Sequence, residues 1–264
     1  MPFPRSTNLF CGMLLASMAL AGCAAPSPSG PVQAAEAYDP LEATNRDIFD
    51  FNQSVDRNVL VPVSEAYRST LPEPVRTGVH NFLQNLDEPL IFAHDILQAE
   101  PALATNTAGR FFINTAFGMA GVFDVATQMG IPYHPNDLGV TLARWGFPEG
   151  AYLIIPVLGP SNVRDALGKA GDSFGDPGNV VAGNYNVLYA SFLRAGTEGI
   201  DTRSRNIETL ADIEKTSLDY YATIRSLYRQ RRAAEIRHEQ DNLPNVTPIQ
   251  GSDAPLPMSY TFTK

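Results

Sequence analysis

The chain has 264 residues, with 28 Asp and Glu against 19 Lys and Arg, so its formal net charge is −9 at pH 7. An acidic chain of this kind does not attract phosphate backbones, which excludes nucleic acid as a partner class, nor does it bind anionic headgroups by bulk electrostatics. Its length is sufficient for one large domain with a sizeable core.

The N-terminal residues resemble the leader of a bacterial lipoprotein. Arg5 precedes a largely apolar segment from Leu9 to Leu20, which is too short to span a bilayer but has the length of a signal-peptide core. Leu20-Ala21-Gly22-Cys23 follows, so we expect cleavage after residue 22 and lipidation of Cys23. Ala24 replaces the aspartate that retains such proteins at the inner membrane. The expected location is therefore the periplasmic side of the outer membrane, the alternative being an ordinary secretory signal.

Two low-complexity segments flank the expected domain. Residues 23–38 comprise the lipidated cysteine and a Pro- and Ala-rich flexible tether, and residues 235–264 form a polar, Pro-containing tail that we expect to be disordered. Because Cys11 leaves with the leader and Cys23 is acylated, the mature domain has no thiol for a disulfide. Residues 39–234 are predicted to form the helical domain.

The first helix is expected to begin at Asp39, which can cap it, with Pro40 in the first position and Glu42 completing a capping box. Ile48, Phe51, Val55 and Val59 then fall on one of its faces. A second helix follows Pro72 and Pro74, and its apolar residues are Val75, Val79, Phe82, Leu83 and Leu86. Two more helices are expected to open at Pro89 and Pro101.

The second half of the chain contains few strand signals. The best candidate runs from Tyr152 to Leu158, but Pro156 interrupts it and no alternating partner is evident nearby. One long amphipathic helix is predicted to run from about Leu210 to Ala234, with several arginines near its C-terminal end. The fold class is therefore mainly α.

Two short apolar stretches differ from ordinary amphipathic helices. Residues 111–123 lie between Arg110 and Asp124 and contain glycines at 118 and 121. Thirteen residues cannot cross a bilayer core of about 30 Å as one helix, but arms of about six residues folded at the glycines would each rise roughly 9 Å. This stretch could be a hairpin inserted into one leaflet or a buried core segment. The second short apolar stretch comprises residues 151–160.

Four blocks of residues, in order between about 38 and 232, carry a resemblance to one family. The first consists of Asp39-Pro40-Leu41-Glu42, Asn45-Arg46 and Phe49-Asp50-Phe51-Asn52. The second consists of Gly109-Arg110-Phe111, Asn114-Thr115, Gly118, Gly121 and Asp124. The third consists of Pro156, Gly159-Pro160-Ser161 and Arg164-Asp165, and the fourth of Ser217, Asp219, Tyr221, Arg225, Tyr228 and Gln230.

Joined to the lipobox, these blocks resemble the MlaA (VacJ) family of outer-membrane phospholipid-transport lipoproteins. Ala151 departs from the pattern, since a proline commonly precedes the tyrosine there. The resemblance implies a compact, disc-like, multi-helix domain embedded in one leaflet, with a central amphipathic channel. It also implies removal of mislocalised phospholipids from the outer leaflet and their transfer to the periplasmic carrier MlaC, with trimeric porins as outer-membrane partners. It implies no enzyme activity and no cofactor.

The motif residues are the candidates for the lipid path. The four charged candidates, Arg110, Asp124, Arg164 and Asp165, could border a headgroup track, but buried charges usually have protein partners, so paired structural charges are the alternative. The remaining candidates are Asn45, Arg46, Phe49, Asn52, Asn114, Gly118 and Gly121.

Two other function classes remain open. Gly171-Asp172-Ser173-Phe174-Gly175 matches the G-x-S-x-G pattern of serine esterases, but a nucleophile elbow needs a buried strand before the serine and the preceding residues do not supply one. A structural lipoprotein that binds other envelope proteins would also fit the anchor, tether and helices. Isolated histidines and the lack of a mature thiol give no support for a metal site.

Overall fold

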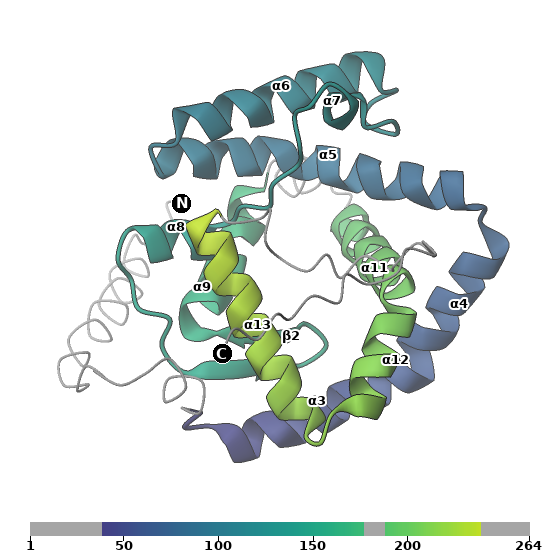
Figure 1. The fold of residues 1–264 in the computed structure, drawn as a ribbon, viewed down its shortest axis with the longest axis vertical. Coiled ribbons are helices and arrows are strands. Elements are labelled where there is room, and N and C mark those ends of the chain that lie inside the picture. Colours follow the sequence, from purple (N-terminus) through teal and green to yellow (C-terminus); the bar gives the residue numbers. More distant parts are fainter. Residues whose placement is uncertain (1–38, 177–187, 239–264) are drawn as a thin grey trace, which may run out of the picture. The chain divides into compact units, whose positions relative to one another are not determined.

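The computed structural model describes residues 39–176 and 188–238 (Figure 1), so Cys23, the leader, the tether and the tail beyond residue 238 lie outside the described residues. The described part is mainly helical, as predicted, with one two-stranded sheet. Its helices are α3 (Glu42–Val55), η1 (Asp56–Leu60), α4 (Val61–Thr70), α5 (Glu73–Leu97), α6 (Pro101–Phe117), α7 (Val125–Gln128), α8 (Leu138–Arg144), α9 (Val163–Gly175), α11 (Leu188–Arg205), α12 (Ile207–Thr216) and α13 (Tyr220–Arg237). The strands are β1 (Tyr152–Ile155) and β2 (Gly159–Asn162).

The first helix starts later than predicted. α3 begins at Glu42 with Leu41 as its N-cap, and a π-helical turn, η1, joins it to α4. The predicted cap at Asp39 is wrong, because its carboxylate accepts the Leu41 N–H at 3.2 Å, before the helix begins, and is otherwise bound by Asn45, Tyr221 and Arg225. The capping box is wrong as well, since the Glu42 side chain pairs with basic residues instead.

The apolar face expected on the first helix is only partly buried. Phe51 of α3 and Val59 of η1 are about half exposed and Ile48 packs against the core, whereas Asn45 and Phe49 are buried. Phe49 packs edge-on against Tyr220 and Tyr221 of α13 in the small apolar core. Hydrophobic spacing therefore located the helix but only part of its inward side.

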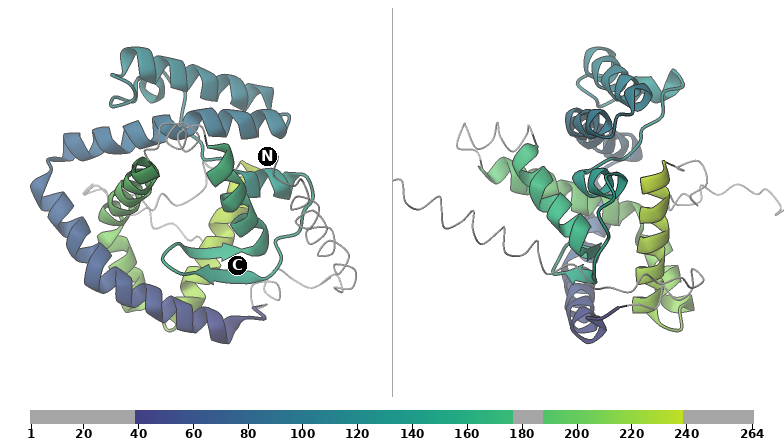
Figure 2. Two further views of the ribbon diagram at one scale, coloured as in Figure 1. Left: turned by 180° about the vertical axis from the view of Figure 1, so that it is seen from behind. Right: turned by 90° about the vertical axis from the view of Figure 1, so that its left-hand side faces the viewer.

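α5 and α6 lie side by side in Figures 1 and 2 and pack along their lengths. The helix predicted after Pro72 and Pro74 is confirmed as α5, but Pro89 lies inside it and does not open another helix. Pro101 does open α6, as predicted. On α5, Leu83 is buried, whereas Phe82 and Leu86 are exposed, so its apolar side also points mostly outward.

The stretch 111–123 contains the end of α6 and a turn. α6 ends at Phe117, and the turn that follows leads to α7, capped by Asp124. Gly121 has a φ of +97°, and a Cβ there would stand 2.4 Å from that of Asn85, so the turn requires glycine. The interpretation as a core segment is wrong, because Phe117 is 77% exposed. The expectation of a second helical arm before Asp124 is also wrong.

The candidate strand has a partner, contrary to expectation. β1 pairs antiparallel with β2, in a register from Tyr152 opposite Asn162 to Ile155 opposite Gly159. Pro156 lies in the connecting turn, where its missing N–H costs no ladder bond. The second apolar stretch is therefore a β-hairpin, with Tyr152 and Ile154 buried.

Two side-chain amides of α3, seven residues apart, hold β1 in place. Asn45 donates to the Tyr152 carbonyl (3.0 Å) and accepts from the Ile154 N–H (2.9 Å). Asn52 donates to the Ile155 carbonyl (3.0 Å) and accepts from the Val157 N–H (2.7 Å). Each amide thus satisfies one donor and one acceptor of the hairpin backbone, Asn45 within β1 and Asn52 at the end of β1 and in the turn that follows.

The predicted long C-terminal helix is wrong, because the chain breaks between α12 and α13. Ser217 is extended, and Asp219 caps α13 by accepting the Ala222 N–H at 3.0 Å. α13 continues to Arg237, beyond the expected domain limit at residue 234. Asp219 is thereby placed to receive a second bond from α3, described below.

Replacement of Asn45 should test this clamp. We expect Asn45→Leu to lower the free energy of unfolding by about 2–4 kcal/mol, because a buried strand carbonyl and N–H each lose their partner. Asn58→Leu is the matched control, since the Asn58 amide is exposed and, in the part of the chain that the structure describes, bonds only to Ser54 in the preceding turn. Denaturant titration of detergent-solubilised protein would measure both, and equal losses in the two variants would contradict a specific role for Asn45.

Candidate functional site

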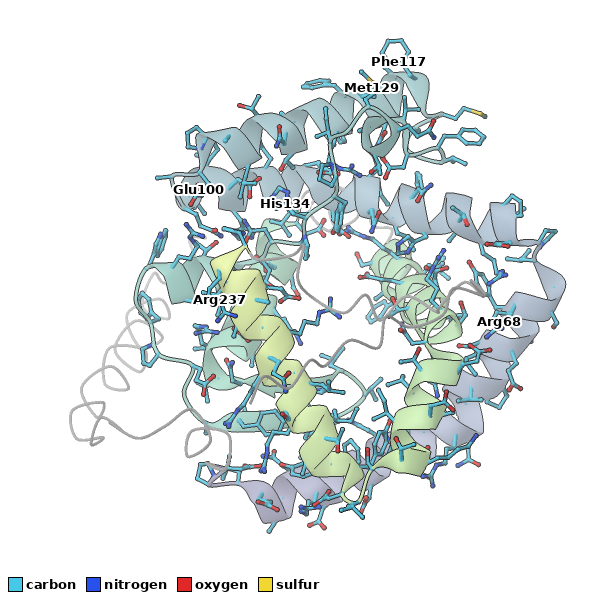
Figure 3. All side chains as sticks on the ribbon, viewed as in Figure 1. Arg68, Glu100, Phe117, Met129, His134 and Arg237 are labelled. Atoms are coloured by element: carbon cyan, nitrogen blue, oxygen red, sulfur yellow. The ribbon has the colours of Figure 1, made fainter. Side chains whose placement is uncertain are left out.

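The described residues have an unusual distribution of polarity: more polar or charged residues than apolar ones are buried, while many large apolar side chains are exposed. Phe117 and Met129, near the end of α6 and in the adjoining segment, point away from the helices in Figure 3. The most exposed members of this apolar surface are Phe112, Phe117, Met119, Met129, Val157, Leu158, Leu167, Phe174, Phe192, Leu193 and Leu218. Large contiguous apolar surfaces on a protein mark contacts with a membrane or with another protein.

The first buried polar network joins α5, α6 and α7 around Arg110, which is only 1% exposed. Its guanidinium donates to Glu88 at 2.7 Å, to Thr127 at 2.9 Å and to Asp124 at 3.3 Å. Burial raises the pKa of Glu88 to about 7, against the opposing effect of the Arg110 hydrogen bond. This network contains two of the predicted charged candidates, in partnership with each other.

Asn114 and the glycines complete this region. The Asn114 amide donates to Asp124 at 3.0 Å and accepts from the Ala126 N–H at 2.9 Å, fixing the start of α7. A Cβ at Gly118 would lie 2.1 Å from the Phe123 carbonyl oxygen. The second motif block therefore builds the turn between α6 and α7 and binds it to α5.

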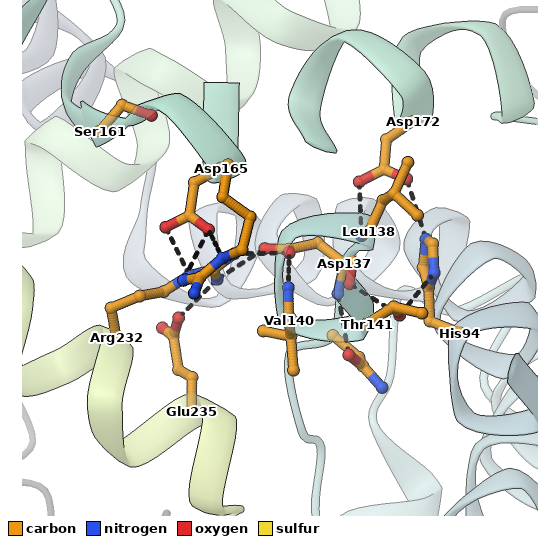
Figure 4. A network of polar contacts seen from close by, with 12 residues as sticks. His94, Asp137, Leu138, Val140, Thr141, Ser161, Asp165, Asp172, Arg232 and Glu235 are labelled. Carbon is orange, nitrogen blue, oxygen red and sulfur yellow. Dashed lines mark hydrogen bonds and ion pairs between the residues drawn. The ribbon is translucent and has the colours of Figure 1, made fainter. Parts of the chain in front are cut away.

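The second network, drawn in Figure 4, joins α8, α9 and α13 around Arg232. Arg232 donates to Asp165 at 2.8 Å and to both carboxylate oxygens of Asp137 at 2.6 and 2.7 Å. Burial alone would raise the pKa of Asp137, but the hydrogen bond and charge of Arg232 outweigh it and lower that pKa. Asp165 also accepts from Arg164 at 3.1 Å, so the third motif block is internally paired too.

Close backbone approach makes room for this second network. A Cβ at Gly139 in α8 would lie 2.4 Å from Arg232 Nη2, and one at Gly168 in α9 would lie 2.5 Å from the Gly139 nitrogen. The two helices can therefore approach closely only with glycine at both positions. Asp165 and Arg232 meet beside this contact.

Two histidines connect α5 to the segments that follow it. His94 contacts Asp172 of α9 at 2.9 Å and the Thr141 hydroxyl of α8 at 3.1 Å. The neighbouring Asp95 is fully buried and accepts from His134 at 3.0 Å and from Thr107 at 2.6 Å. His94 and His134 therefore have a structural role, as hydrogen-bond partners of carboxylates.

Arg46 and Phe49 of the first block meet α13. Arg46 donates to both oxygens of Asp219, at 3.2 and 2.6 Å, and its guanidinium lies over the Tyr221 ring, 4.5 Å from the centroid. Phe49 packs on the same tyrosine. The first and last motif blocks are therefore one contact surface within the protein.

Sequence reasoning missed Glu88, Asp95, Asp137, Gly139 and Arg232. A usable signal existed on α5, where the polar residues Asn85, Glu88 and Asp95 are buried and Phe82, Leu86 and Phe92 are exposed. Polar residues at helical spacing, on a helix that also carries an apolar face, are compatible with burial of the polar face. Nothing local to Asp137 or Arg232 indicated that they would meet.

Ser173 of the esterase-like pattern lies in α9. Its hydroxyl donates to the Lys169 carbonyl one turn earlier, at 2.8 Å, within the helix that starts at Val163. A nucleophile elbow places the serine at a sharp turn between a strand and a helix, which is not the position of Ser173. Among the described residues, no group of His, Cys, Asp and Glu has the arrangement of a metal site.

A family model described as MlaA lipoprotein matches residues 37–235. The chain belongs to the MlaA lipoprotein family. An intermembrane phospholipid transport system lipoprotein MlaA from Escherichia coli (strain K12) is 32% identical over 252 residues, which cover 90% of this chain and 94% of that protein. A protein with the same description from Haemophilus influenzae is 31% identical, covering 85% and 88% of the two chains.

The MlaA assignment extends to the three-dimensional fold. A solved chain from work on the structural basis for maintenance of bacterial outer membrane lipid asymmetry matches with a TM-score of 0.67 at 33% identity. The match covers 75% of this chain and 99% of the solved one. Among the helices that the structure describes, none has both the length and the apolar character needed to cross a bilayer.

Removal of Arg110 should destabilise this MlaA family member strongly. We expect Arg110→Met to cost about 3–5 kcal/mol, because Glu88 would keep a buried carboxylate without its cation. Arg57→Met is the control, since the Arg57 pair with Glu214 is exposed and should contribute no more than about 1 kcal/mol. Denaturant unfolding followed by circular dichroism measures both, and an Arg110→Met loss as small as the control's would refute a central role for this network.

Proposed function

We propose that this chain is the outer-membrane lipoprotein of an intermembrane phospholipid transport system. In that role it removes mislocalised phospholipids from the outer leaflet, passes them to a periplasmic carrier and so maintains the lipid asymmetry of the outer membrane. The observation that carries the proposal is the combination of membership in the MlaA family with an apolar outer surface around a polar, ion-paired interior.

The inverted polarity is the physical requirement for this activity. Exposed aromatic and aliphatic side chains such as Phe112 and Phe117 can lie among acyl chains without loss of hydrophobic free energy, whereas in water they would favour aggregation. Polar residues gathered inside can meet a headgroup that must move through the protein. We propose that the domain lies in one leaflet, anchored through Cys23, because the described helices are too short or too polar to span both leaflets.

The partners belong to the same proposal. A lipoprotein confined to the inner leaflet needs a neighbouring protein that crosses both leaflets, for which trimeric porins are suitable. The extracted lipid needs a soluble acceptor, the periplasmic carrier MlaC. The strong negative charge of the chain makes bulk electrostatic binding to anionic headgroups unfavourable, so membrane contact beyond the anchor would depend on the apolar surface.

We further propose that the chain is not an enzyme. Ser173 lies inside α9, with its hydroxyl bonded to a helix carbonyl, and this geometry does not favour the esterase alternative. A purely structural lipoprotein would share the anchor and the helices but would not move lipid. A measurement of lipid distribution therefore distinguishes a structural lipoprotein from a lipid transporter.

Outer-leaflet phospholipid content in cells with and without the protein tests the function. We expect the content to rise when the protein is absent and to return to normal with the wild-type chain or with Ser173→Ala. Cys23→Ser should fail to restore it, because several acyl chains are needed for stable anchoring. An unchanged content in cells that lack the protein would refute lipid transport, and failure of a normally expressed Ser173→Ala variant would favour the esterase.

Membrane insertion of the α6 end can be tested with a fluorophore on a single cysteine. We expect a probe at Phe117 to be quenched by brominated lipids and protected from aqueous iodide, because its side chain is directed outward from an apolar segment. A probe at Lys215, an exposed polar position on α12, should show the opposite pattern. Iodide access at Phe117 equal to that at Lys215 would rule out insertion of this segment.

A further inference from the structure

A cleft of about 620 Å³, lined by charged side chains and by apolar surface, lies where the start of α5 faces α12 and the end of α11. Its volume is within the range of small-molecule sites. The charged residues that line it come from four helices and are Arg68, Glu73, Arg76, Arg205, Glu208 and Asp212. None of them belongs to the motif blocks or to the two buried networks around Arg110 and Arg232.

Arg68 and Arg205 are held by carboxylates. Arg68 reaches from α4 to Glu208 of α12 at 2.6 Å (Figure 3 labels Arg68), and Arg205 donates to the buried Asp201 at 2.9 Å. Arg205 also donates to the Arg76 carbonyl at 3.1 Å, so it fixes the backbone beside the third arginine. These contacts pre-organise the cleft and leave little of these two charges for a ligand.

Arg76 differs from the other two arginines. Its Nε donates to the Leu71 carbonyl at 3.2 Å, and within residues 39–176 and 188–238 its terminal nitrogens make no hydrogen bond or ion pair. Glu73 and Asp212 likewise line the cleft without a cationic partner in that part of the chain. The cleft therefore contains, among the described residues, one guanidinium without an ion pair, together with a carboxylate one turn before it on α5 and another on α12.

We propose that this cleft binds a zwitterionic phosphodiester with the chemistry of a phosphoethanolamine headgroup. The terminal nitrogens of Arg76 bind the phosphate, for which the planar guanidinium fork is well suited, and Glu73 and Asp212 receive the ammonium group. Ile213 supplies apolar lining. The inference rests on the proposed function, whose lipid class it specifies.

The charge pattern selects among ligands. A headgroup with phosphate and no ammonium, such as phosphoglycerol, would leave the two carboxylates facing an anion, which opposes binding. Inorganic phosphate would meet the same repulsion. An ammonium ion without phosphate would leave Arg76 uncompensated. A ligand that carries both charges satisfies all three residues at once.

Calorimetric titration of the full mature lipoprotein in phosphate-free maltoside micelles tests the cleft. The probes are dihexanoyl phosphatidylethanolamine, dihexanoyl phosphatidylglycerol, glycerophosphoethanolamine and inorganic phosphate. We expect both ethanolamine probes to bind, and Arg76→Gln to weaken their binding about 10- to 100-fold through the lost charge-assisted bonds. Arg57→Gln, an exposed arginine on η1 outside the cleft, is the matched control and should leave the affinity unchanged.

Asp212→Asn provides a second, milder variant. It should weaken binding of the ethanolamine probes while leaving or improving that of phosphatidylglycerol. The inference is overturned if Arg76→Gln has no effect, if Arg57→Gln is equally harmful, or if inorganic phosphate binds as tightly as glycerophosphoethanolamine. Because cellular lipid asymmetry is measured separately, a cleft that fails this titration in a chain that still restores asymmetry overturns the inference alone.

Discussion

The structure depends on buried arginines that are shared among carboxylates of different helices. Arg110 connects α5, α6 and the start of α7, and Arg232 connects α13 to α8 and α9. An unpaired charge at either place would be costly, so these pairs fix which helices are neighbours and in what register. They do so in a domain whose apolar core cluster around Phe49 and Tyr152 is small and whose described buried residues are more often polar than apolar.

This arrangement leaves the apolar side chains on the outside. In a water-soluble protein the apolar face of α5 would be buried against its neighbours, but here Phe82, Leu86 and Phe92 remain exposed while Asn85 and Glu88 are covered. A surface of that kind is stable where the surrounding medium is itself apolar. The same inversion that weakens the core in water therefore suits the proposed position in a leaflet, and the interior becomes available to polar groups of lipid.

The motif residues stabilise the fold, whereas the proposed headgroup cleft would bind the ligand. The four sequence blocks fold the chain: Asn45 and Asn52 hold the β-hairpin, Arg46 binds α13, and Asp165 receives Arg232. The cleft beside Arg76 lies outside them. A family pattern that records mainly the buried, paired residues would miss a ligand site composed of exposed ones, whose identities carry less structural constraint.

The family, the mainly helical class and the starts of α3, α5 and α6 to within a few residues could be predicted from the sequence, because helix-start prolines, apolar spacing and motif blocks are local properties. It could not determine which face of α5 is buried, since periodicity locates an apolar face without saying whether protein or another medium covers it. Nor could it place Pro89 inside a helix or pair β1 with β2. Those features depend on long-range partners: Asn45 for the strand, Asp219 for Arg46 across 173 residues, and Asp137 for Arg232, which only the tertiary structure brings together.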